Sequence, residues 1–313
     1  MGIEQISATV KDNLKAMKQY TATVLFQYEA ELGESPLWDA KRHMLWWVDI
    51  TKGHLHSFDP KTIHDETIVF DTSLGCIVFD EHGNLICAVK NGFSRYRVES
   101  GEIEILKTVE HVHQSIRFND GKCDPEGRFW AGTLAEDGAH DAGILYCLEK
   151  DFSIIEKQQG VGISNGIAWS PSGDTLYYID SVTQRVVAFQ YTSSTGAISH
   201  SRVVIEIPSY VGVPDGMCVD ADGMLWVALW DGGKVVQIHP TSGEILSEVV
   251  VPNVRKVTSC AFGGEDMNTL FITTARQGLT PEEERYEPHA GSLFAVAVDA
   301  FGLQGHVFHG VKK

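Results

Sequence analysis

Six segments of the chain share one pattern, in which a turn rich in Asp, Gly, Ser or Lys precedes a strand with paired large apolar residues. The segments are WDAKRHMLWWVDI, FDEHGNLICAV, CDPEGRFWAGTL, SPSGDTLYYIDS, VDADGMLWVALW and FGGEDMNTLFITTA. One apolar anchor in each strand recurs every 40 to 49 residues: Leu45, Leu85, Phe129, Leu176, Leu225 and Leu270. A repeat of that length is typical of a four-stranded blade with its turns.

The repeats predict an all-β fold, a six-bladed β-propeller. Second hairpins follow most units, for example at 185–207 and 233–251, and helical periodicity is nearly absent after Tyr20. A ring of blades leaves few sheet edges exposed. We expect the ring to close when the strand at 21–29 pairs with strands near the C-terminus. A pair of β-sandwiches is the alternative, but it would not explain six units of similar period.

The N-terminal segment has a different pattern from the repeats. Ile6, Val10, Leu14 and Met17 recur at near-helical spacing, which predicts a short amphipathic helix. We therefore divide the chain into a helical extension at 1–20 and a single propeller domain at 21–313. The segment lacks the apolar core of a signal peptide. No apolar stretch of the sequence approaches the roughly 20 residues that a bilayer-spanning helix needs.

Charge and cysteine content narrow the possible partners and the cellular location of the protein. The chain has 25 Lys and Arg against 42 Asp and Glu, a formal net charge of −17 at pH 7. This balance argues against nucleic acid or an anionic membrane as partner and favours attraction of cations. The six cysteines form no C-x-x-C pair, and several lie in apolar runs, so we expect reduced, buried thiols. A cytoplasmic location fits these features best.

Polar residues recur about ten positions before the anchors, where the chain would enter the innermost strand of each blade. They are Glu34, Asn119, Asn165, Asp215 and Thr258 or Ser259, whereas the second unit has Leu74. Because equivalent positions of a propeller converge around one end of its channel, the first four should face a common point. Asn-Gly and Asp-Gly are also ordinary turn dipeptides. Four such residues at equivalent positions of the repeat nevertheless favour a functional site over four separate turns.

Two carboxylates and two amide oxygens around one point predict one divalent cation. Without it the carboxylates would repel each other, and one would tend to hold a proton. Oxygen ligands favour Ca²⁺, Mg²⁺ or Mn²⁺, and Zn²⁺ is possible. Such a cation can polarise an ester carbonyl and lower the pKa of a bound water molecule, which together favour ester hydrolysis. In such a reaction we hypothesise that Asp215 helps to deprotonate the water that attacks the ester. Arg117, beside this point, indicates an anionic or oxygen-rich ligand.

The same segments resemble the SMP-30/gluconolactonase family. GESPLW, RFNDGKCDPEGRFWAGTLAED, ISNGIAWS, PDGMCVDADGMLWVA and TSCAFGG match its motifs in order and spacing, over about residues 30–300. The resemblance implies a six-bladed propeller with one divalent metal in its central cavity, held by Glu34, Asn165 and Asp215. It also implies substrate contacts from Arg117, Asn119 and Glu136. The chain departs from the family in its N-terminal helix and in the loop at 136–143, which is shorter than in animal regucalcins.

The sequence therefore predicts a metal-dependent lactonase of the gluconolactonase type, with a small sugar lactone as its partner. Two alternatives stay open: a calcium-binding regulatory propeller that hydrolyses nothing, and a related hydrolase of organophosphates or other esters. Ser164 lies in GISNG, which matches the G-x-S-x-G hydrolase motif. That motif requires a following helix, and none is expected here, so Ser164 is not predicted to be a nucleophile.

Overall fold

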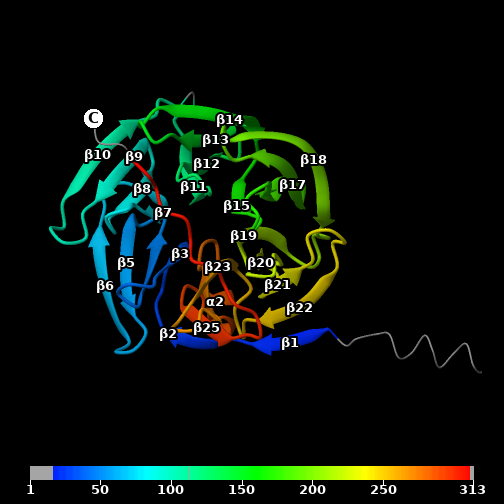
Figure 1. Cartoon of the computed structure of the whole chain (residues 1–313). Coiled ribbons are helices and arrows are strands. Elements are labelled where there is room, and N and C mark those ends of the chain that lie inside the picture. Colours follow the sequence, from blue (N-terminus) through cyan, green and yellow to red (C-terminus); the bar gives the residue numbers. More distant parts are fainter. Residues whose placement is uncertain (1–16, 112, 311–313) are drawn as a thin grey trace, which may run out of the picture.

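Six sheets form a ring around a central channel in the computed structural model, which describes residues 17–111 and 113–310 (Figure 1). Each sheet is one blade, and its strands follow one another from the channel outwards. This arrangement confirms the predicted six-bladed propeller.

The first three blades are continuous in sequence. Blade 1 contains β3 (Gly33–Asp39), β4 (Met44–Asp49), β5 (His54–Asp59) and β6 (His64–Val69). Blade 2 contains β7 (Leu74–Phe79), β8 (Leu85–Val89), β9 (Gly92–Tyr96) and β10 (Ile103–Thr108). Blade 3 contains β11 (Ile116–Cys123), β12 (Phe129–Ala135), β13 (Gly143–Leu148) and β14 (Ile154–Val161).

Blade 4 is also continuous in sequence, whereas blades 5 and 6 each include one N-terminal strand. Blade 4 contains β15 (Ser164–Trp169), β16 (Thr175–Asp180), β17 (Arg185–Thr192) and β18 (Ala197–Glu206), with the 3₁₀ turn η1 (Ser181–Thr183). Blade 5 contains β19 (Val213–Val219), β20 (Leu225–Trp230), β21 (Lys234–Ile238), β22 (Ile245–Val250) and β1 (Lys18–Thr21). Blade 6 contains β23 (Val257–Gly263), β24 (Thr269–Thr274), β25 (Leu293–Ala297) and β2 (Thr23–Phe26), and the short helix α2 (Glu283–Tyr286) lies between β24 and β25.

The N-terminal strands close the ring. β2 pairs antiparallel with β25 as the outermost strand of blade 6, which confirms the predicted pairing of 21–29 with a C-terminal strand. β1 adds a parallel fifth strand to blade 5 by pairing with β22. The predicted N-terminal helix falls on residues 1–16, outside the described residues, apart from its last positions, where β1 begins at Lys18.

The apolar anchors of the repeats lie in the second strand of every blade. All six anchors are fully buried, and Trp47, Trp130 and Trp226 on the same strands are among the largest fully buried side chains. Neighbouring blades cover both faces of the inner strands, so β12 is buried along its whole length, whereas the outer strand β18 is mostly exposed. Burial on both faces explains the paired apolar residues of the repeat.

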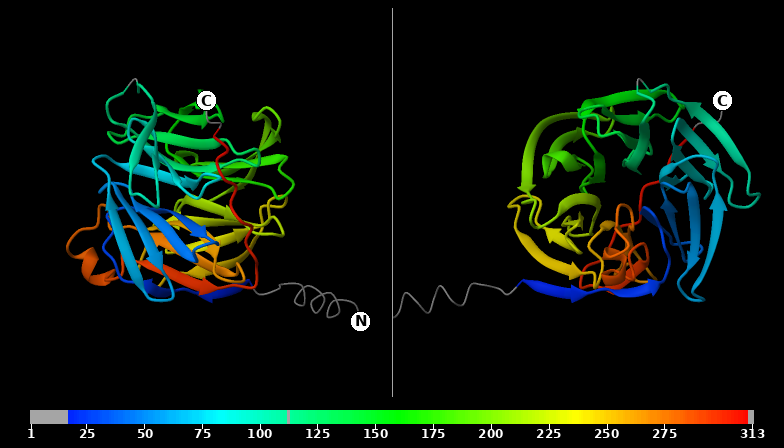
Figure 2. Two further views of the ribbon diagram at one scale, coloured as in Figure 1. Left: turned by 60° about the vertical axis from the view of Figure 1, so that its left-hand side comes forward. Right: turned by 180° about the vertical axis from the view of Figure 1, so that it is seen from behind.

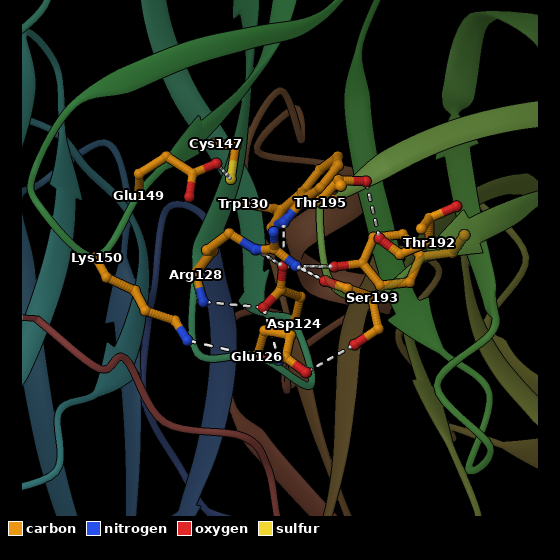
Figure 3. A network of polar contacts seen from close by, with 12 residues as sticks. Asp124, Glu126, Arg128, Trp130, Cys147, Glu149, Lys150, Thr192, Ser193 and Thr195 are labelled. Atoms are coloured by element: carbon orange, nitrogen blue, oxygen red, sulfur yellow. Dashed lines mark hydrogen bonds and ion pairs between the residues drawn. The ribbon is translucent and has the colours of Figure 1, made fainter.

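Aspartates at the ends of innermost strands hold the following turns. The side chains of Asp39, Asp80, Asp124 and Asp220 each accept hydrogen bonds from two or more backbone amides of the next turn. Figure 3 shows the network around fully buried Asp124, which also accepts from Arg128 Nε at 2.6 Å and Trp130 Nε1 at 2.9 Å. These turn contacts lie at the end of each innermost strand remote from its first residues and stabilise the blades.

The two ends of the channel are different. The loop with α2 extends from one side of the ring, and the C-terminal segment crosses the other side, as the left view of Figure 2 shows. On that side Phe308 is fully buried and its amide donates to the Phe79 carbonyl at 2.7 Å, so the segment ties blade 6 to blade 2. The candidate site lies at the opposite end of the channel, beside the α2 loop.

Candidate active site

A cavity of about 280 Å³ opens where the innermost strands begin, at the end of the channel near the α2 loop. Its polar lining comes from four blades and the segment after β24. The lining residues are Leu32, Glu34, Arg117, Asn119, Leu134, Ile163, Asn165, Ser181, Val213, Asp215, Trp230 and Gln277. The structure thus brings together five of the six site residues that the sequence predicts, although up to 181 positions separate them in the chain.

Strand irregularities direct these side chains into the channel. In all six blades, the pairing of the innermost strand with the second strand shifts register next to the equivalent site position. In blade 3 the shift falls between Phe118 and Gly121, on either side of Asn119. Bulges of this kind bend a strand and reorient its side chains. The repeat spacing does not reveal them.

The Asn-Gly and Asp-Gly pairs are not turns here. Asn165 and Asp215 lie inside β15 and β19, and the glycines that follow allow neighbouring innermost strands to come close. A Cβ atom on Gly166 would lie 2.7 Å from the Asp215 carbonyl oxygen, and one on Gly216 would lie 2.1 Å from Ser259 Oγ. The glycines therefore set the width of the channel at the level of the site.

A continuous chain of hydrogen bonds fixes the two amide side chains. Arg117 Nη1 donates to Asn119 Oδ1 at 2.7 Å, and Asn119 Nδ2 donates to Asn165 Oδ1 at 3.0 Å and to the Ser164 carbonyl at 2.8 Å. Asn165 Nδ2 then donates to Ser181 Oγ at 2.9 Å. Because Arg117 can only donate, the direction of the whole chain is determined.

Buried carboxylates give the site a strong preference for positive charge. Burial raises the pKa of Glu34 to about 8, and the Asp120 carboxylate adds to this rise. Burial and the carboxylates of Glu34 and Asp120 raise the pKa of Asp215 well above its ordinary value. Like charges so close together disfavour simultaneous ionisation. A cation placed among them would remove that penalty.

Asp120 is a third buried carboxylate, and the sequence argument did not assign it a role. It lies beside Asn119 in the bulge of β11 but lines a separate cavity of about 140 Å³ toward the other end of the channel. Burial raises its pKa, whereas the ammonium group of Lys122 opposes the rise. Lys122 also lines that cavity and donates to the Met217 carbonyl at 2.8 Å.

Arg117 and Glu136 form an ion pair at the edge of the site. Arg117 Nε lies 3.2 Å from Glu136 Oε1, and the Glu136 side chain is 44% exposed. Glu136 is not among the residues that line the cavity. Glu136 thus contacts the guanidinium group of Arg117, which does line the cavity, and can help to orient it.

In two blades the residue at the equivalent position is not among those that line the cavity. Leu74 of blade 2 is fully buried, as its apolar character predicts. Thr258 of blade 6 donates to the Gly33 carbonyl at 2.6 Å, which joins blades 6 and 1. Sequence reasoning missed Ser181, Trp230 and Gln277, because they lie at or after the ends of the second strands, outside the register that revealed the other residues.

The donor set suits a divalent metal ion that favours oxygen. Glu34 and Asp215 supply carboxylates, and Asn165 supplies an amide oxygen. In the described part of the chain, no three His, Cys, Asp or Glu side chains are grouped so that they could hold a metal. An amide oxygen would have to complete the set, as Ca²⁺ and Mg²⁺ sites permit.

Other observations agree with the sequence analysis. All six cysteines are buried and unpaired, as predicted. Ser164 lies within β15, and its hydroxyl accepts from Tyr178 Oη at 2.7 Å. No helix in the described ranges combines the length and apolar character that crossing a membrane requires.

Fold and site together define a class: six-bladed propellers with a cavity lined by carboxylates and amides at one end of the channel. The chain belongs to the family described as SMP-30/Gluconolactonase/LRE-like region, whose model matches residues 32–276. This confirms the family resemblance of the sequence motifs.

Individual relatives extend over nearly the whole chain. The Bacillus subtilis (strain 168) protein named "Putative sugar lactone lactonase YvrE" is 41% identical over 282 residues, covering 90% of this chain and 96% of that protein. Regucalcin of Xenopus laevis is 36% identical over 280 residues, covering 88% and 93%. Among solved structures, a calcium-binding regucalcin of Agrobacterium tumefaciens superposes with a TM-score of 0.89 at 25% identity, covering 94% of this chain and 99% of that one.

Proposed function

We propose that this protein is a metal-dependent hydrolase that opens sugar lactones of the aldonolactone type. The observation that carries the proposal is the convergence of Glu34, Asn165 and Asp215 in one cavity that also holds Arg117 and Asn119. The sugar lactone lactonase named among the relatives supports the substrate class. The calcium-binding regucalcin supports a divalent cation.

In this proposal Glu34, Asn165 and Asp215 hold the cation. When bound, the cation would supply Lewis-acid chemistry, polarising the lactone carbonyl and making water more acidic. Ca²⁺, Mg²⁺, Mn²⁺ and Zn²⁺ all remain candidates for the native ion.

The protein's own groups would bind the lactone and move the proton. Arg117 would bind an oxygen of the lactone through Nη2, since among the described residues none accepts a hydrogen bond from that atom. Asn119 would contact the substrate only as an acceptor, because both of its N–H groups are used within the protein. Glu136 would keep the guanidinium group in place.

Asp215 would act as general base and then as general acid. It would accept a proton from the attacking water while the water oxygen bonds to the carbonyl carbon. When the ring C–O bond breaks, Asp215 would return the proton to the departing ring oxygen, and the product is the open hydroxy acid. Proton transfers of this kind typically contribute about 10²–10⁴-fold to the rate.

The cavity wall suits a compact ring. Leu32, Leu134, Ile163, Val213 and Trp230 line the cavity together with its polar residues. The C–H face of a sugar ring can pack against such apolar side chains while its oxygens contact the polar ones. The loop that begins at Glu136 lies at this edge, so its short length bears on which lactone is preferred.

Hydrolysis of glucono-δ-lactone by metal-stripped and metal-resupplied protein tests the proposal. Acid release above the spontaneous rate should disappear with a chelator and return with one of Ca²⁺, Mg²⁺, Mn²⁺ or Zn²⁺. Metal binding without turnover of any lactone would contradict the lactonase proposal. Tests on organophosphates and other esters would then separate a related hydrolase from a calcium-binding propeller without hydrolysis.

A further inference from the structure

Ser181 links two of the residues that would hold the cation. It is 3% exposed and opens the turn η1, directly after β16. Its hydroxyl donates to the Pro214 carbonyl at 2.6 Å and accepts from Asn165 Nδ2 at 2.9 Å. Asp215 directly follows Pro214, so one hydroxyl contacts the side chain of one proposed ligand and the backbone beside another.

The turn that presents Ser181 is itself held in place. The Asp180 side chain accepts from the amides of Gly162 at 3.0 Å and Ile163 at 2.9 Å. Thr183 Oγ1 donates to the Asp180 carbonyl at 2.7 Å. Ser181 therefore has a fixed position against which the Asn165 amide can be oriented.

The contacts of Ser181 allow one orientation of the Asn165 amide. A carbonyl can only accept, so the single hydroxyl hydrogen of Ser181 is committed to Pro214. Ser181 can then only accept from Asn165, which places Nδ2 toward Ser181 and Oδ1 toward Asn119. A flipped amide would bring two acceptors together at Ser181 and two donors together at Asn119.

We propose that Ser181 is a positioning residue that keeps the Asn165 amide oxygen available to the divalent cation. This inference rests on the proposed cation site but not on which substrate is hydrolysed. Groups that orient metal ligands typically change metal affinity by about 10–100-fold when they are removed. Ser181 would act in this way through its side-chain contact with Asn165.

Direct titration of metal-stripped protein with Mn²⁺, with free Mn²⁺ followed by electron paramagnetic resonance, tests the proposal without any turnover. Ser181→Ala should weaken Mn²⁺ binding by about 10–100-fold. Ser181→Cys, which keeps the volume but has a weak hydrogen-bonding group, should also weaken it and serves if the alanine variant does not fold. Ser172→Ala is the control: it removes an exposed hydroxyl from the turn between β15 and β16, at the end of β15 remote from Asn165, and should bind Mn²⁺ like the unchanged protein.

A second background separates positioning from a purely structural role. In Asn165→Asp the carboxylate presents oxygens in either orientation, so adding Ser181→Ala or Ser181→Cys should cost little further affinity. The proposal would be overturned if the Ser181 substitutions lowered Mn²⁺ affinity equally in the unchanged protein and in Asn165→Asp. Unchanged Mn²⁺ binding by Ser181→Ala and Ser181→Cys would also overturn it. If the unchanged protein binds no Mn²⁺, the cation site fails and this inference fails with it. If it binds Mn²⁺ but opens no lactone, only the proposed reaction fails.

Discussion

The side-chain nitrogen of Asn119 lies 3.0 Å from the side-chain oxygen of Asn165, although 46 positions separate the two residues. This bond joins the innermost strands of blades 3 and 4. It makes the proposed substrate-side amide and the proposed metal-side amide parts of one hydrogen-bonded unit. A substitution on the substrate side of the cavity should therefore change cation binding on the metal side.

Asn119→Ala tests this coupling. The substitution removes the donor to Asn165 Oδ1 and the acceptor for Arg117, so the Asn165 amide loses one of its two orienting contacts. Mn²⁺ affinity should fall by about 10–100-fold, although Asn119 is not a proposed ligand. Titration of the metal-stripped variant measures the effect. Unchanged Mn²⁺ binding with a raised KM for lactone would show instead that Asn119 acts on the substrate alone.

Asp215→Asn should reduce turnover strongly because an amide cannot accept the proton of the attacking water. We expect kcat to fall by about 10²–10⁴-fold at Mn²⁺ concentrations that titration shows to be saturating. Asp120→Asn is a matched control, since it removes a charge from the same buried cluster without removing a group from the site cavity. Similar losses in both variants would mean that charge, rather than proton transfer, explains the effect.

Arg117→Lys should weaken substrate binding more than cation binding. A lysine cannot reproduce the forked contacts with Asn119, the Phe118 carbonyl and Glu136 while also offering a second nitrogen to the lactone. KM for glucono-δ-lactone should rise by roughly tenfold, the loss of about one charge-assisted hydrogen bond. Glu136→Gln, measured in the same assay, should produce a smaller rise. A larger effect from Glu136→Gln would indicate that Glu136 itself contacts the substrate.

The raised pKa of Glu34 predicts how cation binding depends on pH. Below about pH 8 the metal-free site holds a proton on Glu34, and a cation must displace it. Mn²⁺ affinity should therefore rise with pH up to about 8, with proton release that calorimetry detects in buffers of different ionisation enthalpy. Glu34→Gln should bind Mn²⁺ more weakly and release fewer protons. Proton release equal to that of the unchanged protein would assign the proton to another group.

The same pKa shift has a consequence for stability. The folded metal-free protein holds the Glu34 proton up to about pH 8, whereas the unfolded chain releases it near the ordinary value of 4.5. The folded state thus binds more protons in this window, and its free energy of unfolding falls as pH rises from about 4.5 to 8. Thermal unfolding of metal-free protein across this window should show that fall, and Glu34→Gln should make it shallower.

Much of this molecule could be predicted from its sequence because a propeller repeats. Each blade buries its second strand in the same way, so the anchors Leu45 to Leu270 report the period of the fold. Once the period is known, Glu34, Asn119, Asn165 and Asp215 fall at one level of the channel. The closure of the blades into a ring is enough to predict that these four side chains converge.

The remaining features depend on contacts between blades, which no period encodes. Ser181 lies after a second strand and reaches Asn165 because η1 turns it inwards. The bulges that direct Asn119 into the channel also bury Asp120 behind it. Glu136, predicted to contact the substrate, follows the end of β12 and forms an ion pair with Arg117. These positions follow from how each strand end is bent.

Gly216 offers a final test of how closely the strands around the site are packed. A Cβ atom there would lie 2.1 Å from Ser259 Oγ and 2.8 Å from Ser259 Cα, so a rotation of the serine side chain cannot relieve the clash. Gly216→Ala should lower the free energy of unfolding by about 1–3 kcal/mol. It should also weaken Mn²⁺ binding, because Asp215 is the preceding residue. Urea denaturation measures the first effect and Mn²⁺ titration the second.

Gly305→Ala is the control, since nothing lies within 4 Å of its added Cβ, and its urea midpoint should stay near that of the unchanged protein. Equal midpoints for Gly216→Ala and Gly305→Ala would show that the innermost strands of blades 5 and 6 can separate without cost.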